Sequence, residues 1–288
     1  MPIITIGMPV YNCERTLSHS IQSILNQDFH DWELLVIDDG STDSSAAVAE
    51  SFRDARIHVL RRTDNRGLPT RLNEAVALAK GKYFARMDGD DICYPDRLRK
   101  QVDFLDRHPE VDVLGAGMVV FGSGGRLLGC RIGPEDHASI CARPWAGLHM
   151  AHPTWMGRIE WFRAHPYRED AVRMEDKELL FRTFRSSRFA NLPDILLGYR
   201  EESLSLSKIL PSRKNYCRVL LEDGLRSRRY VSMLAGIASQ CVRAVMDVVA
   251  VSTGLNHKLL RQRARPCTSA VAREWGEVFQ RVTRNSGN

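Results

Sequence analysis

Short apolar runs alternate with segments of helical periodicity over residues 3–115, and this alternation constrains the fold more than any other feature of the chain. Strands that alternate with helices form a parallel sheet with helices on both faces. We therefore predict an α/β fold built on a mostly parallel sheet. The predicted strands are 3–8, 33–37, 57–60, 83–87 and 111–115, and the predicted helices are 12–26, 44–53, 70–79 and 96–107.

The rest of the chain divides near residue 210. Residues 122–147 are rich in Gly and Pro and are predicted to form a hairpin or loops, whereas 148–200 return to strand, helix and strand. From Ser212 onward the pattern is helical, with no strand signal. The sequence therefore predicts one large α/β unit and a helical extension over 211–288.

The basic charge of the chain is confined to this extension. Residues 1–210 hold 27 Lys and Arg against 30 Asp and Glu, whereas residues 211–288 hold 14 against 5. A basic extension indicates an anionic partner. No DNA-binding or RNA-binding module is visible in the sequence, so nucleic acid is not the expected partner.

One segment of the extension, Leu234 to Val251, has the periodicity of an amphipathic helix, with Gln240, Arg243 and Asp247 on its polar face. A transmembrane span would need about 20 mainly apolar residues without such a face. Two roles stay open: the helix packs on the main domain, or it lies on an anionic membrane beside basic residues. Those basic residues are Arg226, Arg228, Arg229, Lys258, Arg261, Arg263 and Arg265.

The cysteines and the first residues indicate a cytoplasmic protein. Seven scattered cysteines without a CxxC pair favour neither a zinc site nor a disulfide framework. Residues 1–5 lack the basic and apolar regions of a signal peptide, so no such peptide is expected.

Polar clusters follow three of the predicted strands, at the edge of the sheet where ligands of such folds bind. The clusters are 9–12, 38–43 and 88–91. In the last cluster, Asp88, Asp90 and Asp91 repel one another unless a cation or special solvation is present. Oxygen ligands of this kind suit Mg²⁺ or Mn²⁺, which commonly bridge to substrate phosphates. The alternative is an acidic turn that caps a helix, and the neighbouring clusters favour the metal.

Two further acidic positions are candidates for contact with substrates. Asp39 ends a predicted strand, where a carboxylate can accept hydrogen bonds from a nucleobase or ribose; the alternative is a helix cap. Asp176, beside Glu175, begins a predicted helix and is placed to deprotonate an acceptor hydroxyl. The alternative for this pair is a favourable interaction with the helix dipole.

Taken in order, the motifs resemble the family 2 glycosyltransferases of GT-A fold. They are Pro9–Asn12, Ile37–Asp43, Asn65–Leu68 with Leu72 and Asn73, Met87–Asp91 with Pro95–Leu98, and Glu175 with Asp176. The resemblance covers about residues 3–200. It implies a GT-A fold, with a nucleotide-sugar-binding half over 1–105 and an acceptor-binding half over 106–210. It also implies a metal-dependent transfer that inverts the anomeric centre of the sugar.

The same resemblance implies a role for each matching residue. Asp176 would be the general base, and Asp90, supported by Asp91, would bind Mn²⁺ or Mg²⁺. The residues implied at the nucleotide-sugar are Pro9, Tyr11, Glu14, Asp39, Arg66, Asp88 and Arg200. Those expected at the acceptor are His152, Trp155 and Glu175.

The expected reaction is sugar transfer to a glycan or glycolipid in the synthesis of a surface polysaccharide or lipid-linked glycan. UDP is the preferred nucleotide, and the expected place is the cytoplasm, at the inner face of the plasma membrane if the extension binds lipid. A Rossmann dehydrogenase is excluded because Met8–Asn12 carries no GxGxxG motif. A nucleotidyltransferase, which would carry a Gly-rich basic loop after the first strand, and a non-catalytic scaffold protein that binds nucleotide-sugars remain as alternatives.

Overall fold

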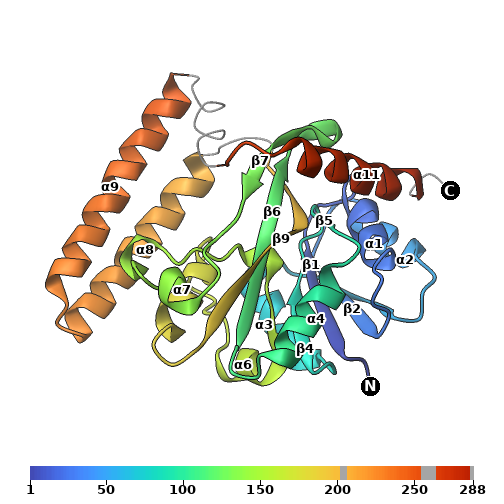
Figure 1. Cartoon of the computed structure of the whole chain (residues 1–288), viewed down its shortest axis with the longest axis horizontal. Coiled ribbons are helices and arrows are strands. Elements are labelled where there is room, and N and C mark those ends of the chain that lie inside the picture. Colours follow the sequence, from blue (N-terminus) through green and yellow to red (C-terminus); the bar gives the residue numbers. More distant parts are fainter. Residues whose placement is uncertain (202–205, 254–263, 286–288) are drawn as a thin grey trace.

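A mixed sheet runs through the centre of the molecule (Figure 1). The computed structural model describes residues 1–201, 206–253 and 264–285, and in this part the sheet has nine strands in the order β3-β2-β1-β4-β8-β6-β9-β5, with β7 paired to β6. The strands are β1 (Ile4–Val10), β2 (Trp32–Asp39), β3 (Ile57–Arg62), β4 (Tyr83–Arg86), β5 (Ile92–Cys93), β6 (Val113–Phe121), β7 (Leu127–Arg131), β8 (Met156–Arg158) and β9 (Phe189–Arg200). Strands β3, β2, β1 and β4 are mutually parallel, which confirms the predicted α/β fold in this half of the sheet. In the other half, β5, β7 and β8 pair antiparallel with their neighbours, so the sheet as a whole is mixed.

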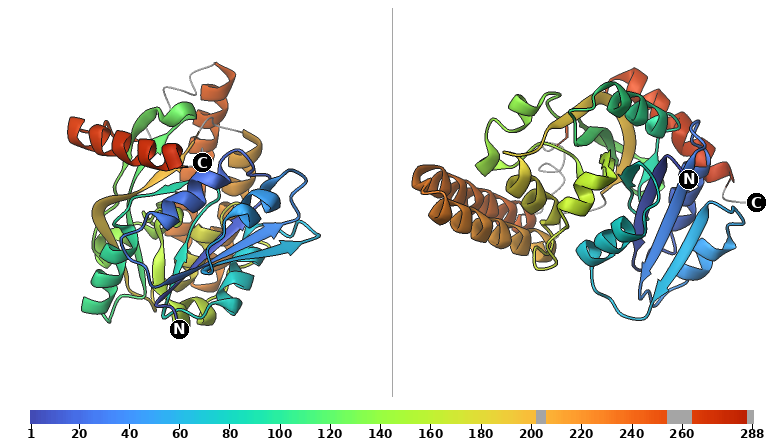
Figure 2. Two further views of the ribbon diagram at one scale, coloured as in Figure 1. Left: turned by 90° about the vertical axis from the view of Figure 1, so that its right-hand side faces the viewer. Right: turned by 90° about the horizontal axis from the view of Figure 1, so that it is seen from below.

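Helices cover both faces of the sheet (Figures 1 and 2). They are α1 (Leu17–Leu25), α2 (Ser45–Ser51), α3 (Leu68–Leu78), α4 (Arg97–Arg107), α5 (His137–Ile140), α6 (Ile159–Ala164), α7 (Glu175–Thr183), α8 (Leu206–Arg226), α9 (Tyr230–Ser252) and α11 (Ser269–Asn285). Short 3₁₀ turns lie at Ser123–Gly125, Pro144–Ala146 and His152–Thr154. Helices α1 and α4 pack on one face, and α3, α6 and α7 pack on the other.

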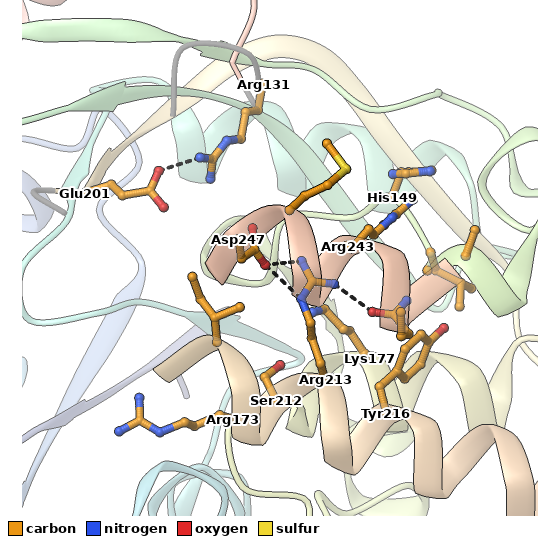
Figure 3. A pocket seen from close by; sticks show the side chains of 16 residues that line it. Arg131, His149, Arg173, Lys177, Glu201, Ser212, Arg213, Tyr216, Arg243 and Asp247 are labelled. Carbon is orange, nitrogen blue, oxygen red and sulfur yellow. Dashed lines mark hydrogen bonds and ion pairs between the residues drawn. The ribbon is translucent and has the colours of Figure 1, made fainter. Parts of the chain in front are cut away.

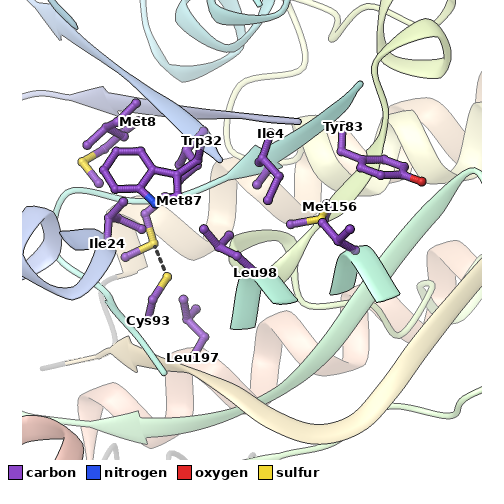
Figure 4. Packing of buried hydrophobic residues seen from close by; sticks show 14 of the residues in the cluster. Ile4, Met8, Ile24, Trp32, Tyr83, Met87, Cys93, Leu98, Met156 and Leu197 are labelled. Carbon is purple, nitrogen blue, oxygen red and sulfur yellow. Dashed lines mark hydrogen bonds between the residues drawn. The ribbon is translucent and has the colours of Figure 1, made fainter. Parts of the chain in front are cut away.

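The larger core cluster shows why the predicted periodicities produce these layers. Leu17, Ile21 and Ile24 share one side of α1 and are fully buried against the apolar strands. Figure 4 shows part of this cluster, which includes Trp32 of β2, Met87 after β4 and Leu98 of α4. Continuous apolar strands of this kind are buried on both faces, as parallel strands are.

The last helix, α11, returns to the main sheet. Its Trp275 lies 4.7 Å from the ring of Phe121 on β6 and donates a hydrogen bond from Nε1 to the Gly125 carbonyl (2.8 Å). Gly198 of β9 faces the same indole so closely that a side chain there would overlap it. The last helix of the predicted extension over 211–288 therefore packs on the main sheet (Figure 1).

Helices α8 and α9 form a pair at one side of the molecule (Figure 2). Arg213 of α8 donates hydrogen bonds to Gln240 (2.8 Å) and to Asp247 (2.5 Å) of α9, so these two polar residues are buried between the helices. The opposite side of α9 is an apolar stripe that is between 52% and 85% exposed. The stripe consists of Val231, Leu234, Val242, Val245 and Val249.

This arrangement confirms an amphipathic α9: Ile237 packs against the core, whereas the apolar stripe does not pack on the main domain. The Arg213 contacts turn part of the polar side inward, and the apolar stripe faces outward. By length and composition alone, α9 is the one helix in the described part of the chain that is apolar enough to cross a membrane. Of the predicted basic residues, Arg226, Arg228 and Arg229 are exposed at the α8–α9 turn. Lys258, Arg261 and Arg263 lie outside the described residues.

Candidate active site

The carboxyl ends of β1, β2 and β4 bring the three predicted polar clusters to one edge of the sheet. Strand β1 lies between the other two, and the loop that follows it contacts both neighbours. Asn12 adopts a left-handed φ of 52°, accepts a hydrogen bond from the Thr42 amide (2.9 Å) and donates its own amide to Ser41 Oγ (3.0 Å). On the other side, a Cβ at Gly89 would lie 2.8 Å from Val10 Cγ1, so the close approach there requires glycine.

Asp39 holds the loop before α3 in place. Its Oδ1 accepts hydrogen bonds from the Arg66 amide (2.9 Å) and Arg71 Nε (2.6 Å), and its Oδ2 accepts one from the Gly67 amide (2.8 Å). A carboxylate has about four acceptor positions, so about one is left for a ligand. Arg71 was not a predicted site residue, although its buried guanidinium is the charge partner of Asp39.

The acidic cluster after β4 has the composition of a cation site. One carboxylate oxygen from each of Asp88, Asp90 and Asp91 lies within 4.8 Å of the others. Burial, and then the Asp88 carboxylate, raise the pKa of Asp90 to about 6. Burial and both neighbouring carboxylates raise the pKa of Asp91 well above its ordinary value, and its Oδ2 is a buried atom without a hydrogen-bond partner. Burial and mutual repulsion make three neighbouring carboxylates unfavourable as anions, and a divalent cation would offset both effects.

Two arginines surround the acidic cluster. Arg200, at the end of β9, donates its amide to Asp91 Oδ1 (2.9 Å) and its Nε to the Asp90 carbonyl (3.0 Å), which places this predicted contact residue beside the cluster. Arg86, at the end of β4, is buried and pairs through Nη2 with Asp88 (2.5 Å). Its Nε and Nη1 have no hydrogen-bond partner. Arg86 was not predicted, although a charged residue in an otherwise apolar strand was a usable signal.

Glu175, at the start of α7, lies close enough to Arg86 for its carboxylate to act on the guanidinium. Burial opposes the charge of Arg86, but the carboxylates of Asp88, Asp91 and Glu175 outweigh burial and raise its pKa. Glu175 is buried, and burial followed by the Asp176 carboxylate raises its pKa to about 7. Asp176 itself is half-buried. The acidic cluster and the start of α7 are therefore joined electrostatically through one buried guanidinium.

His152 and Trp155, the predicted acceptor contacts, face the interior instead. Trp155 is 0% exposed, and its ring lies 4.6 Å from that of His152. The His152 Nε2 is hydrogen bonded to the Tyr167 hydroxyl (3.0 Å), and burial followed by the charge of Arg86 lowers the pKa of His152 well below its ordinary value. The structure corrects the prediction, because an indole enclosed by apolar side chains cannot stack on a sugar.

The remaining predicted nucleotide contacts lie around the β1 loop and the loop before α3. Pro9 is buried within β1, whereas Tyr11 is exposed. Glu14 accepts a hydrogen bond from the Ser44 amide (3.0 Å), which ties it to the start of α2. The Arg66 guanidinium is exposed and lies 3.7 Å from Glu169. Direct contact of these four side chains with a nucleotide stays a prediction.

Comparison with known proteins gives the family. The model of "Glycosyl transferase family 2" matches residues 5–166. The putative glycosyltransferase EpsE of Bacillus subtilis is 40% identical over 210 residues, which are 70% of this chain and 74% of that protein. WfgD of Escherichia coli, a UDP-Glc:alpha-D-GlcNAc-diphosphoundecaprenol beta-1,3-glucosyltransferase, is 38% identical over 103 residues, which are 36% of this chain and 41% of that protein.

Solved structures give the same fold. The crystal structure of Staphylococcus aureus TarS 1–349 matches with a TM-score of 0.62 at 23% identity, over 83% of this chain and 71% of that one. TarS 1–349 has also been solved in complex with UDP-GlcNAc. The fold resembles that of GT-A neighbours, as the sequence predicts. Since the family model covers more than half of the chain and EpsE is similar over most of its length, this chain belongs to glycosyl transferase family 2.

Proposed function

We propose that this enzyme transfers a sugar from a UDP-sugar to an acceptor hydroxyl, with inversion and with a divalent metal. The observation that supports the proposal is the cluster of Asp88, Asp90 and Asp91, which Arg86 links electrostatically to Glu175 at the start of α7. A single displacement needs a cation site for the leaving group and a base for the acceptor hydroxyl, and Asp176, the candidate base, follows Glu175 directly. The preference for UDP is supported by the names of WfgD and of the TarS complex.

On the donor side, Asp90 and Asp91 would hold Mn²⁺ or Mg²⁺, which when bound neutralises charge on a nucleoside diphosphate. Arg200, fixed by its contacts with the same acidic segment, would add a cation for the diphosphate. Asp88 is paired with Arg86 and would meet the ribose or the diphosphate. Asp39, with about one free acceptor position, would bind the base.

On the acceptor side, Asp176 would remove the proton of the attacking hydroxyl. The hydroxyl oxygen forms the new bond to the anomeric carbon while the bond from that carbon to the diphosphate oxygen breaks. The proton stays on Asp176 and the electron pair leaves with the nucleoside diphosphate. Attack from the face opposite the leaving group inverts the anomeric centre. Glu175, whose raised pKa leaves it partly protonated near neutral pH, would hydrogen-bond the acceptor.

The acceptor we propose is a glycan or glycolipid at the cytoplasmic face of a membrane, in surface polysaccharide or lipid-linked glycan synthesis. WfgD acts on a diphosphoundecaprenol-linked sugar, as its name states. In this chain, the exposed apolar stripe of α9 suits the interfacial region of a bilayer. Arg226, Arg228 and Arg229 at one end of the stripe suit anionic headgroups, at about 1 kcal/mol for each residue.

The decisive experiment is a donor screen with purified protein, Mn²⁺ and UDP-, GDP- and dTDP-sugars, scored by release of the nucleoside diphosphate. We expect Asp176→Asn to lose about 10²–10⁴-fold in turnover, because a general base contributes a factor of that order. Asp170→Asn is the matched control, since Asp170 is an exposed aspartate nearby that pairs with Arg168. Equal release by wild type and Asp176→Asn would remove Asp176 from its role.

Metal dependence has a separate test. Calorimetry with UDP is expected to show binding in Mn²⁺ and a large loss of affinity in EDTA. Unchanged affinity in EDTA would contradict the assignment of Asp90 and Asp91. UDP binding without sugar transfer to any acceptor would favour the non-catalytic alternative.

A further inference from the structure

A cavity of about 750 Å³ lies between the α8–α9 pair, the first turn of α7 and the ends of β7 and β9 (Figure 3). We call it the basic pocket, because five cationic side chains line it: Arg131, Arg173, Lys177, Arg213 and Arg243. Two acidic side chains, Glu201 and Asp247, also line it, so three positive charges remain in excess. The proposed donor site does not use this cavity.

Two of the five cations are neutralised within the pocket. Arg213 is held by Asp247, and Arg131 is paired with Glu201, as the dashed lines in Figure 3 show. Both ion pairs are part of the pocket lining, and the charges within each pair cancel.

The other three cations are available to a ligand. Arg173, Lys177 and Arg243 are exposed, and among the described residues none of them forms an ion pair with a carboxylate. They come from three places in the chain: the loop before α7, α7 itself and α9. Cations that converge on a recess from separate elements favour an anion with several acceptor oxygens.

The basic pocket adjoins the candidate active site at two points. On α7, Asp176 is followed directly by Lys177 of the pocket wall, and at the end of β9, Arg200 is followed directly by Glu201. Tyr216 of the pocket wall donates a hydrogen bond to the Pro144 carbonyl (2.7 Å). Burial raises the pKa of Tyr216, the Asp176 carboxylate adds to this effect, and the charge of Arg243 opposes it.

We infer that the basic pocket binds a phosphate or diphosphate group of the acceptor and thereby positions the acceptor hydroxyl at Asp176. This inference rests on the proposed function, since it assigns the substrate class of the same site. The donor diphosphate has its own partners at the acidic cluster and Arg200, so it does not need these cations. A membrane surface is flat on this scale, whereas the free cations here line a recess.

The test measures binding of inorganic pyrophosphate to the full chain by calorimetry, in EDTA so that no metal bridges the anion to the acidic cluster. The double variant Lys177→Gln with Arg243→Gln is expected to bind pyrophosphate at least about tenfold more weakly, because two charge-assisted contacts are lost. Arg53→Gln is the matched control: Arg53 is exposed near the end of α2, away from the pocket lining, and its removal is expected to leave binding unchanged. Arg213 is unsuitable for substitution, because it already forms an ion pair with the buried Asp247 and its loss would disturb the packing of α8 on α9.

Three results would overturn the inference: no pyrophosphate binding by wild type, equal binding by the double variant, or binding that is lost only in Arg200→Gln, which would place the anion in the donor site. UDP affinity in Mn²⁺, measured on the same samples, tests the proposed donor site separately. We expect it to be equal in wild type and the double variant. Phosphatidylcholine vesicles with and without phosphatidylglycerol distinguish the source of the phosphate. A double variant that loses only vesicle binding would assign the cations to lipid headgroups and refute the acceptor site.

Discussion

Glu175 is buried at the start of α7 beside another carboxylate, and replacing it with glutamine should stabilise the protein at alkaline pH. Folding raises its pKa from 4.5 to about 7, so the folded state binds this proton more tightly than the unfolded chain does. The contribution of Glu175 to stability is therefore most favourable below pH 4.5 and is lost as the pH rises through 7. At about 1.4 kcal/mol per pKa unit, the loss amounts to about 3 kcal/mol. Glutamine resembles the protonated acid and does not suffer this loss.

Urea unfolding of wild type and Glu175→Gln at pH 5 and pH 8 measures the effect. We expect similar free energies of unfolding at pH 5 and an advantage of about 3 kcal/mol for the variant at pH 8. Glu160→Gln, at an exposed position in the first turn of α6, is the control and should show no such pH dependence. Because other groups titrate in the same range, the test compares wild type and variant at each pH and uses the difference between their free energies of unfolding. An identical pH dependence in wild type and Glu175→Gln would refute the claim that folding raises the pKa of Glu175.

Three further predictions concern residues away from the acidic cluster. Trp155→Ala should lower the free energy of unfolding by about 3–5 kcal/mol, because it removes a fully buried side chain and leaves a cavity. Trp155→Phe should change the KM for the acceptor by no more than about twofold. A large rise in that KM would show that Trp155 does contribute to acceptor binding. Asp247→Asn should lower stability by about 3 kcal/mol in chemical denaturation, because Arg213 loses its charge partner, and an unchanged midpoint would contradict the importance of the pair. Val242→Asp with Val245→Asp should reduce co-sedimentation with lipid vesicles at least about tenfold while UDP affinity stays constant; equal sedimentation would show that the stripe does not contact lipid.

Much of the fold could be predicted because its strands and helices differ in simple periodicity. Buried parallel strands are continuous apolar runs, and helices on a sheet repeat apolar residues every three or four positions. The convergence of the clusters at 39 and 88–91 followed from a rule of parallel sheets, whose strand ends meet at one edge. The predicted helix at 12–26 begins only at Leu17, because Asn12 and its neighbours are used in contacts with the loop after β2.

The parts that sequence could not predict depend on contacts between distant segments. Nothing near Trp155 in the sequence distinguishes a core tryptophan from one that stacks on a sugar. The sequence left two roles open for α9, because one residue of another helix, Arg213, decides which side of α9 is buried. Arg86 differs from these cases, because a charged residue in an apolar strand beside Asp88 was a usable signal; only its interaction with Glu175 joins distant segments.

The position of α11 means that the catalytic unit does not end where its motifs end. Trp275 lies against Phe121 at the end of β6 and Gly198 near the end of β9, and β9 itself ends at Arg200, which contacts Asp90 and Asp91. A shortened chain that stops before Ser269 would keep every signature residue and still match the family. It would also expose Phe121 and Gly198 to water, and Gly198 lies on the strand that positions Arg200 beside the acidic cluster. Relatives whose sequences differ after the α8–α9 pair should therefore carry another large aromatic side chain that covers Phe121 and Gly198.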